Sequence, residues 1–209
     1  MEYTLALDIA PADLDVIKNA GQKITLMKRT SNSSANVIWL TIDPFQSNTV
    51  QWQEDYWMYA SNTVYANGST ISKLSETSPG PAQDGMMYTF ANNNFSEPAK
   101  APDVPSGTFA AVNQVSYQQY PSLIFGLAQS AMVNELPVDR KPISARPVLS
   151  TQHVAITPYT IVDVFLQGHF ESETIITNVI GSLASARFGG SVNTIRMTYS
   201  PTVGVFVQR

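Results

Sequence analysis

Two histidines and a short acidic run are the residues best suited to acid–base or metal chemistry in this 209-residue chain. In the segment GHFESE, His169, Glu171 and Glu173 would share one face of an extended strand, where they could hold a metal ion or act as an acid–base pair. The same residues also suit a solvated strand end, and His153 lies in the apolar alternation QHVAI, which is typical of a half-buried histidine. No phosphate loop, dinucleotide fingerprint, nucleophile elbow or zinc-ligand spacing occurs. We therefore expect no catalytic residues, no metal site and no cofactor.

Paired carboxylates are a second possible source of acid–base chemistry. Glu54 and Asp55 are adjacent in the sequence, so on a strand they would point to opposite faces and could not form a catalytic pair by themselves. A Ser–His–Asp triad needs no particular spacing in sequence, so a hydrolase remains a third interpretation of the chain.

An aromatic stretch, Gln51–Tyr65, is the most conspicuous candidate for binding. Six of its fifteen residues are Trp, Tyr or Met, and Trp and Tyr combine an apolar ring with a polar tip that suits a partly buried contact. Trp52 falls on the alternation expected of a strand and is predicted to be core. Tyr56, Trp57 and Tyr59 lie beside a turn-rich region, where loops often carry function, and are predicted to bind a ligand.

A second aromatic cluster, Tyr117 and Tyr120 in YQQYP, lies within Val104–Asn134, which contains no charged residue. We expect these two rings to be partly exposed, close together, and to line a neutral binding surface. The uncharged run holds more large apolar side chains than one strand face needs. Since isolated soluble proteins rarely expose a large apolar patch, we expect a homo-oligomer or association with a membrane.

Composition and net charge indicate which partners and which cellular location to expect. Charged residues make up 13% of the chain, about half the usual share, and the net charge is −4 with no cluster of Lys or Arg. Tight nucleic-acid binding needs a concentrated basic patch, so we expect no nucleic-acid partner. The sequence contains no cysteine, and it shows no signal peptide and no segment long enough for a transmembrane helix. We expect synthesis in the cytoplasm, with action outside the cell possible after release.

These residues must be positioned by strands. Alternation and β-branched residues predict strands over 3–9, 23–29, 37–42, 49–59, 85–91, 108–117, 122–132, 153–157, 160–167, 191–199 and 202–208. Pro11 and the apolar spacing of Leu14 and Ile17 predict a short helix over 12–20. The prediction is an all-β, antiparallel β-sandwich with one or two short α-helices. It is a single domain, 1–209, with a possible sub-division near the prolines of 137–147.

The order of motifs over residues 10–130 resembles the actinoporin and fungal fruit-body lectin-like family. The matching segments are DLDVIKNAGQKITLMKR with TSNSSANVIWLTI, then SPGPAQDGMMYTF, then GTFAAVNQVSYQQYP. The resemblance implies a β-sandwich without enzymatic activity that binds phosphocholine headgroups or glycans through an aromatic pocket. The matching positions are Tyr117 and Tyr120, with Met86 and Tyr88 nearby.

The chain also departs from that family. A Val-Pro pair of the lipid-binding loop reads Val115-Ser116, a dense tryptophan cluster is replaced by YPSLIF, and the C-terminal third has no counterpart. From sequence, the leading interpretation is a non-enzymatic binding protein of the cytolysin or lectin type, which engages lipid headgroups or glycans through an aromatic, uncharged surface. The alternative is a self-assembling structural protein.

Overall fold

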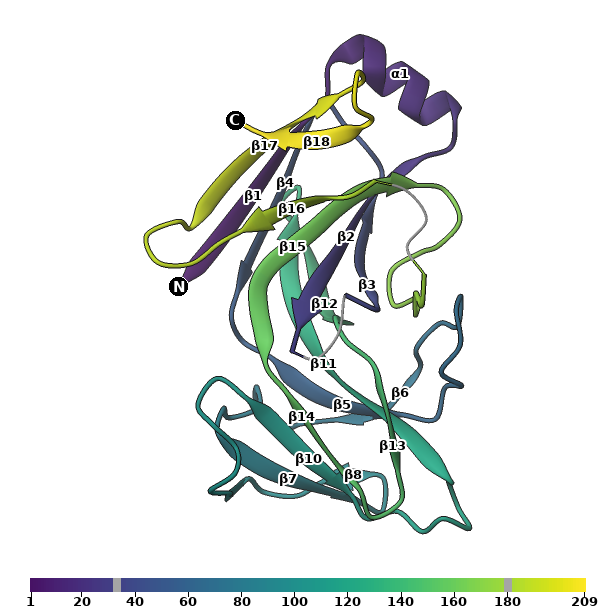
Figure 1. The fold of residues 1–209 in the computed structure, drawn as a ribbon, viewed down its shortest axis with the longest axis vertical. Coiled ribbons are helices and arrows are strands. Elements are labelled where there is room, and N and C mark those ends of the chain that lie inside the picture. Colours follow the sequence, from purple (N-terminus) through teal and green to yellow (C-terminus); the bar gives the residue numbers. More distant parts are fainter. Residues whose placement is uncertain (32–34, 179–181) are drawn as a thin grey trace.

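The computed structural model describes residues 1–31, 35–178 and 182–209, and strands dominate it (Figure 1). The largest sheet runs in the order β18 (Val205–Gln208), β17 (Thr194–Ser200), β1 (Glu2–Asp8), β4 (Ser47–Gln53), β11 (Ser122–Val133), β5 (Trp57–Ser61), β6 (Lys73–Glu76), and β12 (Leu136–Pro142) and β13 (Arg146–Leu149) also pair with β11. A five-stranded sheet contains β14 (His153–Ile156), β10 (Phe109–Asn113), β7 (Met86–Ala91), β8 (Asn94–Phe95) and β9 (Ala99–Lys100). A four-stranded sheet has the order β16 (Ala184–Arg187), β15 (Pro158–Gln167), β2 (Lys23–Thr30), β3 (Ile38–Ile42).

The all-β prediction is therefore confirmed, with one short helix. Most neighbouring strands are antiparallel, but β1 pairs with β17 in parallel, and β7 pairs with β10 in parallel. In Figure 1 the four-stranded sheet crosses the upper half of the nine-stranded sheet, and the five-stranded sheet closes the lower end.

The helix α1 (Pro11–Asn19) follows β1 and lies at the top of Figure 1. Proline stands at its first position, where its missing N–H costs no hydrogen bond. Leu14 and Ile17 are its buried residues, and Gly21 follows the end with a φ of 64°, which glycine adopts without strain. None of the helical segments among the described residues has the length and apolar character needed to cross a membrane.

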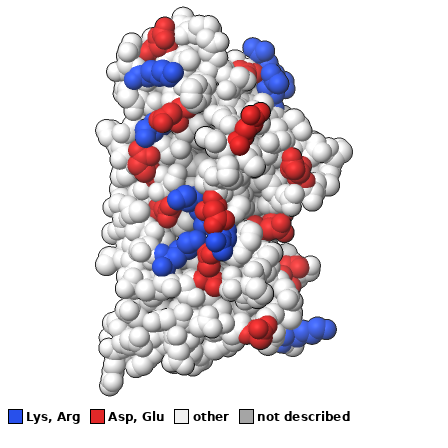
Figure 2. Space-filling model, turned by 180° about the vertical axis from the view of Figure 1, so that it is seen from behind, with Lys and Arg blue, Asp and Glu red and all other residues white. Residues whose placement is uncertain are grey.

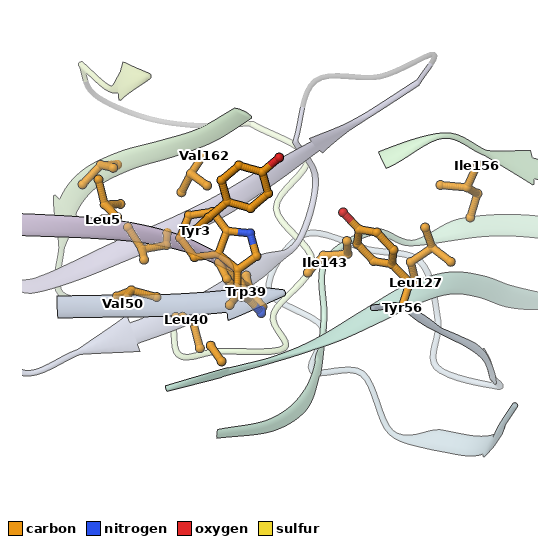
Figure 3. Close-up of a cluster of buried hydrophobic side chains, with 14 of the residues drawn as sticks. Tyr3, Leu5, Trp39, Leu40, Val50, Tyr56, Leu127, Ile143, Ile156 and Val162 are labelled. Atoms are coloured by element: carbon orange, nitrogen blue, oxygen red, sulfur yellow. The ribbon is translucent and has the colours of Figure 1, made fainter. Parts of the chain in front are cut away.

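The main core lies between the nine-stranded and four-stranded sheets and continues into the lower end of the molecule. Strands of both sheets supply it, and Figure 3 shows Tyr3, Leu5 and Val50 of the first with Trp39, Leu40 and Val162 of the second. Trp39 is wholly buried and Trp52 nearly so, which confirms the prediction that Trp52 is core. Their ring centroids are 5.6 Å apart in an edge-to-face arrangement, which is favoured between aromatic side chains.

The long strand β11 explains the run of apolar residues that the sequence shows there. Leu123, Phe125 and Leu127 face the main core, whereas Ile124 and Ala128 face a second buried cluster that also contains Tyr59. Over residues 123–129 the strand is thus buried on both faces within one chain. The uncharged run consequently gives no support to the expectation that association is needed to cover it.

One further sequence prediction differs from the structure. The strand predicted over 49–59 is two strands, because β4 ends at Gln53 and β5 begins at Trp57. The proline-containing segment 137–147 contributes to two strands, since β12 and β13 are hydrogen-bonded to β11 on either side of a short connection, and the sub-division expected near it stays a prediction. Prolines are tolerated there because both strands lie off the central path of the sheet.

Charge is sparse on the molecular surface. Figure 2 shows one face on which charged side chains of both signs gather near the middle and most of the surrounding surface is uncharged. Several surface charges are already paired, as in Lys73 with Glu76 and Arg140 with Asp139. On this face the charges are therefore few, and they are concentrated near the middle.

Candidate functional site

The three aromatic residues predicted around the start of β5 do not form one exposed surface. Tyr56 and Tyr59 are buried, and only Trp57 is half-exposed. The Tyr56 ring packs edge-on against Phe109, and the Tyr59 hydroxyl donates a hydrogen bond to the Ser144 carbonyl at 2.7 Å. The break between β4 and β5 changes which residues of this segment point inward, so the sequence alternation did not predict their burial.

The residues suggested by the family resemblance are also dispersed. Tyr88 is buried and its hydroxyl accepts a hydrogen bond from the Gln83 amide, while Met86 is half-buried against the core. Tyr117 is 67% exposed in the loop between β10 and β11, and Tyr120 in the same loop is half-buried against the core. Both rings are thus at least partly exposed, as predicted, but Tyr117 lies in a loop, because the strand predicted over 108–117 ends at Asn113. Only Tyr117 presents most of its ring to solvent.

Of the acid–base candidates, the two glutamates are engaged in ion pairs, and His153 is exposed and not half-buried as its alternation suggested. Glu171 pairs with Lys23 at 2.7 Å, and Glu173 pairs with Lys141. In the part of the chain that the structure describes, no three His, Asp or Glu side chains come together as metal ligands would.

A groove of about 420 Å³ lies on the outer face of the nine-stranded sheet, over β4, β11 and β12. The register of the strands produces it. Directly opposed residues of antiparallel strands point to the same side of a sheet. Glu2 is opposed to Gln53, and Met132 is opposed to Gln51 on one neighbouring strand and to Pro137 on the other, so these side chains share the outer face. We call this the outer groove; its lining residues are Glu2, Gln51, Trp52, Gln53, Asp55, Trp57, Ser130, Ala131, Met132, Pro137, Val138 and Asp139.

Polar side chains in the outer groove surround one accessible aromatic ring. Trp57 is held from one side by the Arg140 guanidinium, whose carbon lies 5.8 Å from the ring centroid. Asp139 is oriented by Arg140 and by the Ser130 hydroxyl. Gln53 and Asp55 are exposed, so their amide and carboxylate groups are free to meet a ligand. Trp57 is the one aromatic residue predicted to bind a ligand that lines the outer groove.

Directly beneath the outer groove is a polar cluster that the sequence analysis missed. Lys28 on β2 is wholly buried, and its ammonium donates hydrogen bonds to Gln129 Oε1 at 2.6 Å and to Glu54 Oε1 at 3.2 Å. Three aromatic rings surround the nitrogen, with centroids 5.3 Å (Trp39), 5.1 Å (Trp52) and 5.5 Å (Tyr56) away. We call this group of six residues the Lys28 cage.

Every polar group of the Lys28 cage has a partner. Glu54 accepts hydrogen bonds from the Trp52 indole at 2.9 Å and from the Tyr56 hydroxyl. The side-chain amide nitrogen of Gln129 donates to the backbone carbonyl of Gln53 at 2.6 Å, and the backbone carbonyl of Gln129 accepts from the Trp39 indole at 3.1 Å. The cage therefore joins β2 and β3 of one sheet to β4 and β11 of the other.

Burial governs ionisation in the Lys28 cage. Loss of hydration lowers the pKa of Lys28 to about 8, although the negative charge of Glu54 acts in the opposite direction. Burial likewise raises the pKa of Tyr56, and Glu54 raises it further. One sequence signal could have marked the site: Lys28 follows Ile24 and Leu26 at every second position of a strand, which places a lysine on an inward-facing side.

Comparisons of the chain with protein-family models, with curated proteins and with solved structures gave no match. The resemblance to the actinoporin and fungal lectin-like family therefore stays a prediction, and the function must be argued from the chemistry of the site.

Proposed function

We propose that the chain is a non-enzymatic, lectin-type protein that binds a neutral glycan in the outer groove. The observation that carries this proposal is the composition of the groove, where the Trp57 ring is accompanied by exposed amide, carboxylate and hydroxyl groups. A sugar ring has an apolar face of C–H groups, which packs on an aromatic ring, and a rim of hydroxyls. Carboxylates and amides satisfy those hydroxyls as acceptors and donors.

The size and position of the outer groove also favour this function. About 420 Å³ lies within the range of pockets that hold small ligands, and the groove is open along the sheet surface. Trp57 is fixed by Arg140 on one side and by a buried cluster on the other, so little side-chain entropy is lost when a ligand stacks on it. The outer groove carries the carboxylates of Glu2, Asp55 and Asp139, which disfavour a phosphorylated ligand and leave a neutral one.

The test is an array of neutral oligosaccharides probed with the wild-type protein and with Trp57→Ala. We expect binding by the wild type and a loss of about five- to thirtyfold in affinity for the variant, because one stacked aromatic contributes about 1–2 kcal/mol. Tyr159→Ala is the matched control, since Tyr159 is an exposed aromatic residue on β15 in the other sheet. Binding that survives Trp57→Ala would contradict the assignment of the groove.

A second candidate, lipid-headgroup binding, is favoured by the loop between β10 and β11. Tyr117 in this loop and Leu149 at the end of β13 are both largely exposed, and the loop meets the residue after β13 where the Ser150 hydroxyl donates to the Val115 carbonyl at 2.7 Å. The loop has no charged residue. If neutral phosphatidylcholine vesicles bind the protein and Tyr117→Ala abolishes that binding while the glycan array stays blank, this candidate replaces the first.

A further inference from the structure

The Lys28 cage places an amine from one sheet against a side-chain amide from the other. Lys28 lies on β2, which is an inner strand of the four-stranded sheet, and Gln129 lies on β11 of the nine-stranded sheet. Their side chains meet at 2.6 Å between Nζ and Oε1, and the Glu54 carboxylate lies 3.2 Å from the same nitrogen. The surrounding rings of Trp39, Trp52 and Tyr56 exclude water from the pair.

We propose that Lys28 and Gln129 react to form an intramolecular amide bond that cross-links the two sheets, with Glu54 as the catalytic proton carrier. The chain would thereby modify itself, without any cofactor, and independently of what the outer groove binds.

The first requirement is a neutral amine close to the amide carbon. The pKa of Lys28 is lowered to about 8 by burial, so at pH 7 about a tenth of the molecules carry the neutral amine, which is the nucleophilic form. The carbonyl bond of Gln129 is about 1.2 Å long, which puts Cδ no more than about 3.8 Å from Nζ. That separation is close to the roughly 3–3.5 Å of a near-attack geometry.

The second requirement is proton transfer. When the Lys28 nitrogen attacks Cδ of Gln129, a C–N bond forms and the nitrogen gives up a proton to the Glu54 carboxylate. Glu54 then returns this proton to Nε2 of Gln129, the old C–N bond breaks, and ammonia leaves. One amine and one amide give one new amide and ammonia, so atoms and electrons balance and no oxidant is needed.

The contacts of Glu54 suit this role. The Trp52 indole and the Tyr56 hydroxyl hold its two oxygens, so the carboxylate keeps its position beside Nζ. The Glu54 side chain is 27% exposed, whereas Lys28 is wholly buried, so Glu54 connects the cage to solvent and marks the exit for ammonia. The departing nitrogen of Gln129 already points to the Gln53 carbonyl, at the exposed end of β4.

The reaction also removes an energetic cost. A buried ammonium that is paired with a partly exposed carboxylate loses more hydration than it recovers. Conversion of the amine to an amide leaves a neutral N–H in the same place. Formation of the bond is therefore favoured by the same burial that lowers the pKa of the amine.

Intact mass spectrometry of the folded protein tests the proposal. We expect a mass lower than that of the sequence by one ammonia, and a proteolytic fragment in which the segments around Lys28 and Gln129 are joined. Lys23→Arg, on the same strand and with its side chain in a surface ion pair, should show the same loss. An unchanged mass after prolonged incubation of the folded protein at pH 9 would overturn the proposal. Loss of one water with Lys28 joined to Glu54 would overturn the assignment to Gln129.

Variants separate the roles of the three residues. Lys28→Met should retain the full mass, and Glu54→Ala should retain both reacting groups but stay unlinked. Gln129→Glu should reach the same linked product by losing water instead of ammonia. A linked Glu54→Ala protein would overturn the role given to Glu54, and the wild-type mass decides the proposal even if a variant fails to fold.

Discussion

Lys28 is the residue on which both the pH dependence of stability and the proposed cross-link depend. Lys28 is buried among three aromatic rings and two polar side chains, and its ionisation affects both stability and the proposed cross-link. In the folded protein its pKa is about 8, below the value of 10.5 expected in the unfolded chain. Between those values the unfolded chain holds more protons than the folded one, so stability from this group rises with pH.

The first prediction uses Gln129→Met, which cannot form the amide bond and keeps a free Lys28 amine. Its unfolding free energy should rise, relative to Lys28→Met/Gln129→Met, by up to about 3 kcal/mol as pH increases from 8 to 10.5. Below pH 8 the difference should be constant. Urea unfolding at a series of pH values measures it. The double variant cancels the contribution of the buried tyrosines, and a flat difference across the window would contradict the lowered pKa.

The sequence predicted the burial or direction of a side chain correctly where the alternation of a single strand determines it. Trp52 is core as expected, because it lies in β4, where buried side chains alternate with more exposed ones. The pair Glu54 and Asp55 does point to opposite sides, with Glu54 in the cage and Asp55 in the outer groove. The Lys28 cage itself could not be predicted, because its partner Gln129 is 101 residues away and on another sheet.

At the scale of elements, β11 is the strand on which the rest of the fold depends. It pairs with β4, β5, β12 and β13, and its side chains enter two buried clusters. The sequence predicted its limits to within a residue, because a long apolar run between turns allows no other element. The predicted strand over 49–59 failed, since the break at 54–56 is imposed by Glu54 and Tyr56 turning toward Lys28, a long-range contact.

The second prediction concerns Gly126, the point at which β11 passes closest to its neighbours. A Cβ at this position would lie 1.9 Å from the Ser144 carbonyl oxygen and 2.6 Å from the Tyr59 ring. Gly126→Ala should therefore reduce the unfolding free energy by about 3 kcal/mol or more, because backbone must move to admit the methyl group. Gly80→Ala is the control, since nothing lies within 4 Å of its Cβ, and it should change stability by less than about 0.5 kcal/mol. Equal thermal denaturation of the two variants would show that β11 is less constrained than its packing indicates.

At the scale of the whole molecule, one chain buries the apolar residues that sequence analysis expected a partner to cover. Phe109, Leu123 and Phe125 are all internal, and the exposed large apolar side chains lie on many different strands and loops. Self-association therefore stays a prediction without support from the uncharged run, and sedimentation of the purified chain would test it. The outer groove carries the carboxylates of Glu2, Asp55 and Asp139, which disfavour an anionic ligand and suit the neutral ligand proposed there.

The last prediction concerns the effect of the proposed bond between the sheets on the unfolding free energy of the protein. A link between Lys28 and Gln129 would close a loop of about 100 residues and so remove conformational freedom from the unfolded chain, by analogy with a disulfide of the same span. Lys28→Met/Gln129→Met cannot form the link but fills nearly the same volume with apolar side chains, a replacement of buried polar groups that is often tolerated. Its unfolding free energy in guanidinium should be lower than that of the linked wild type by about 5 kcal/mol. Glu54 remains able to reach water in this variant, so its lost partner adds little to the difference. Wild-type and double-variant proteins that unfold at the same denaturant concentration would show that the sheets are held by packing alone.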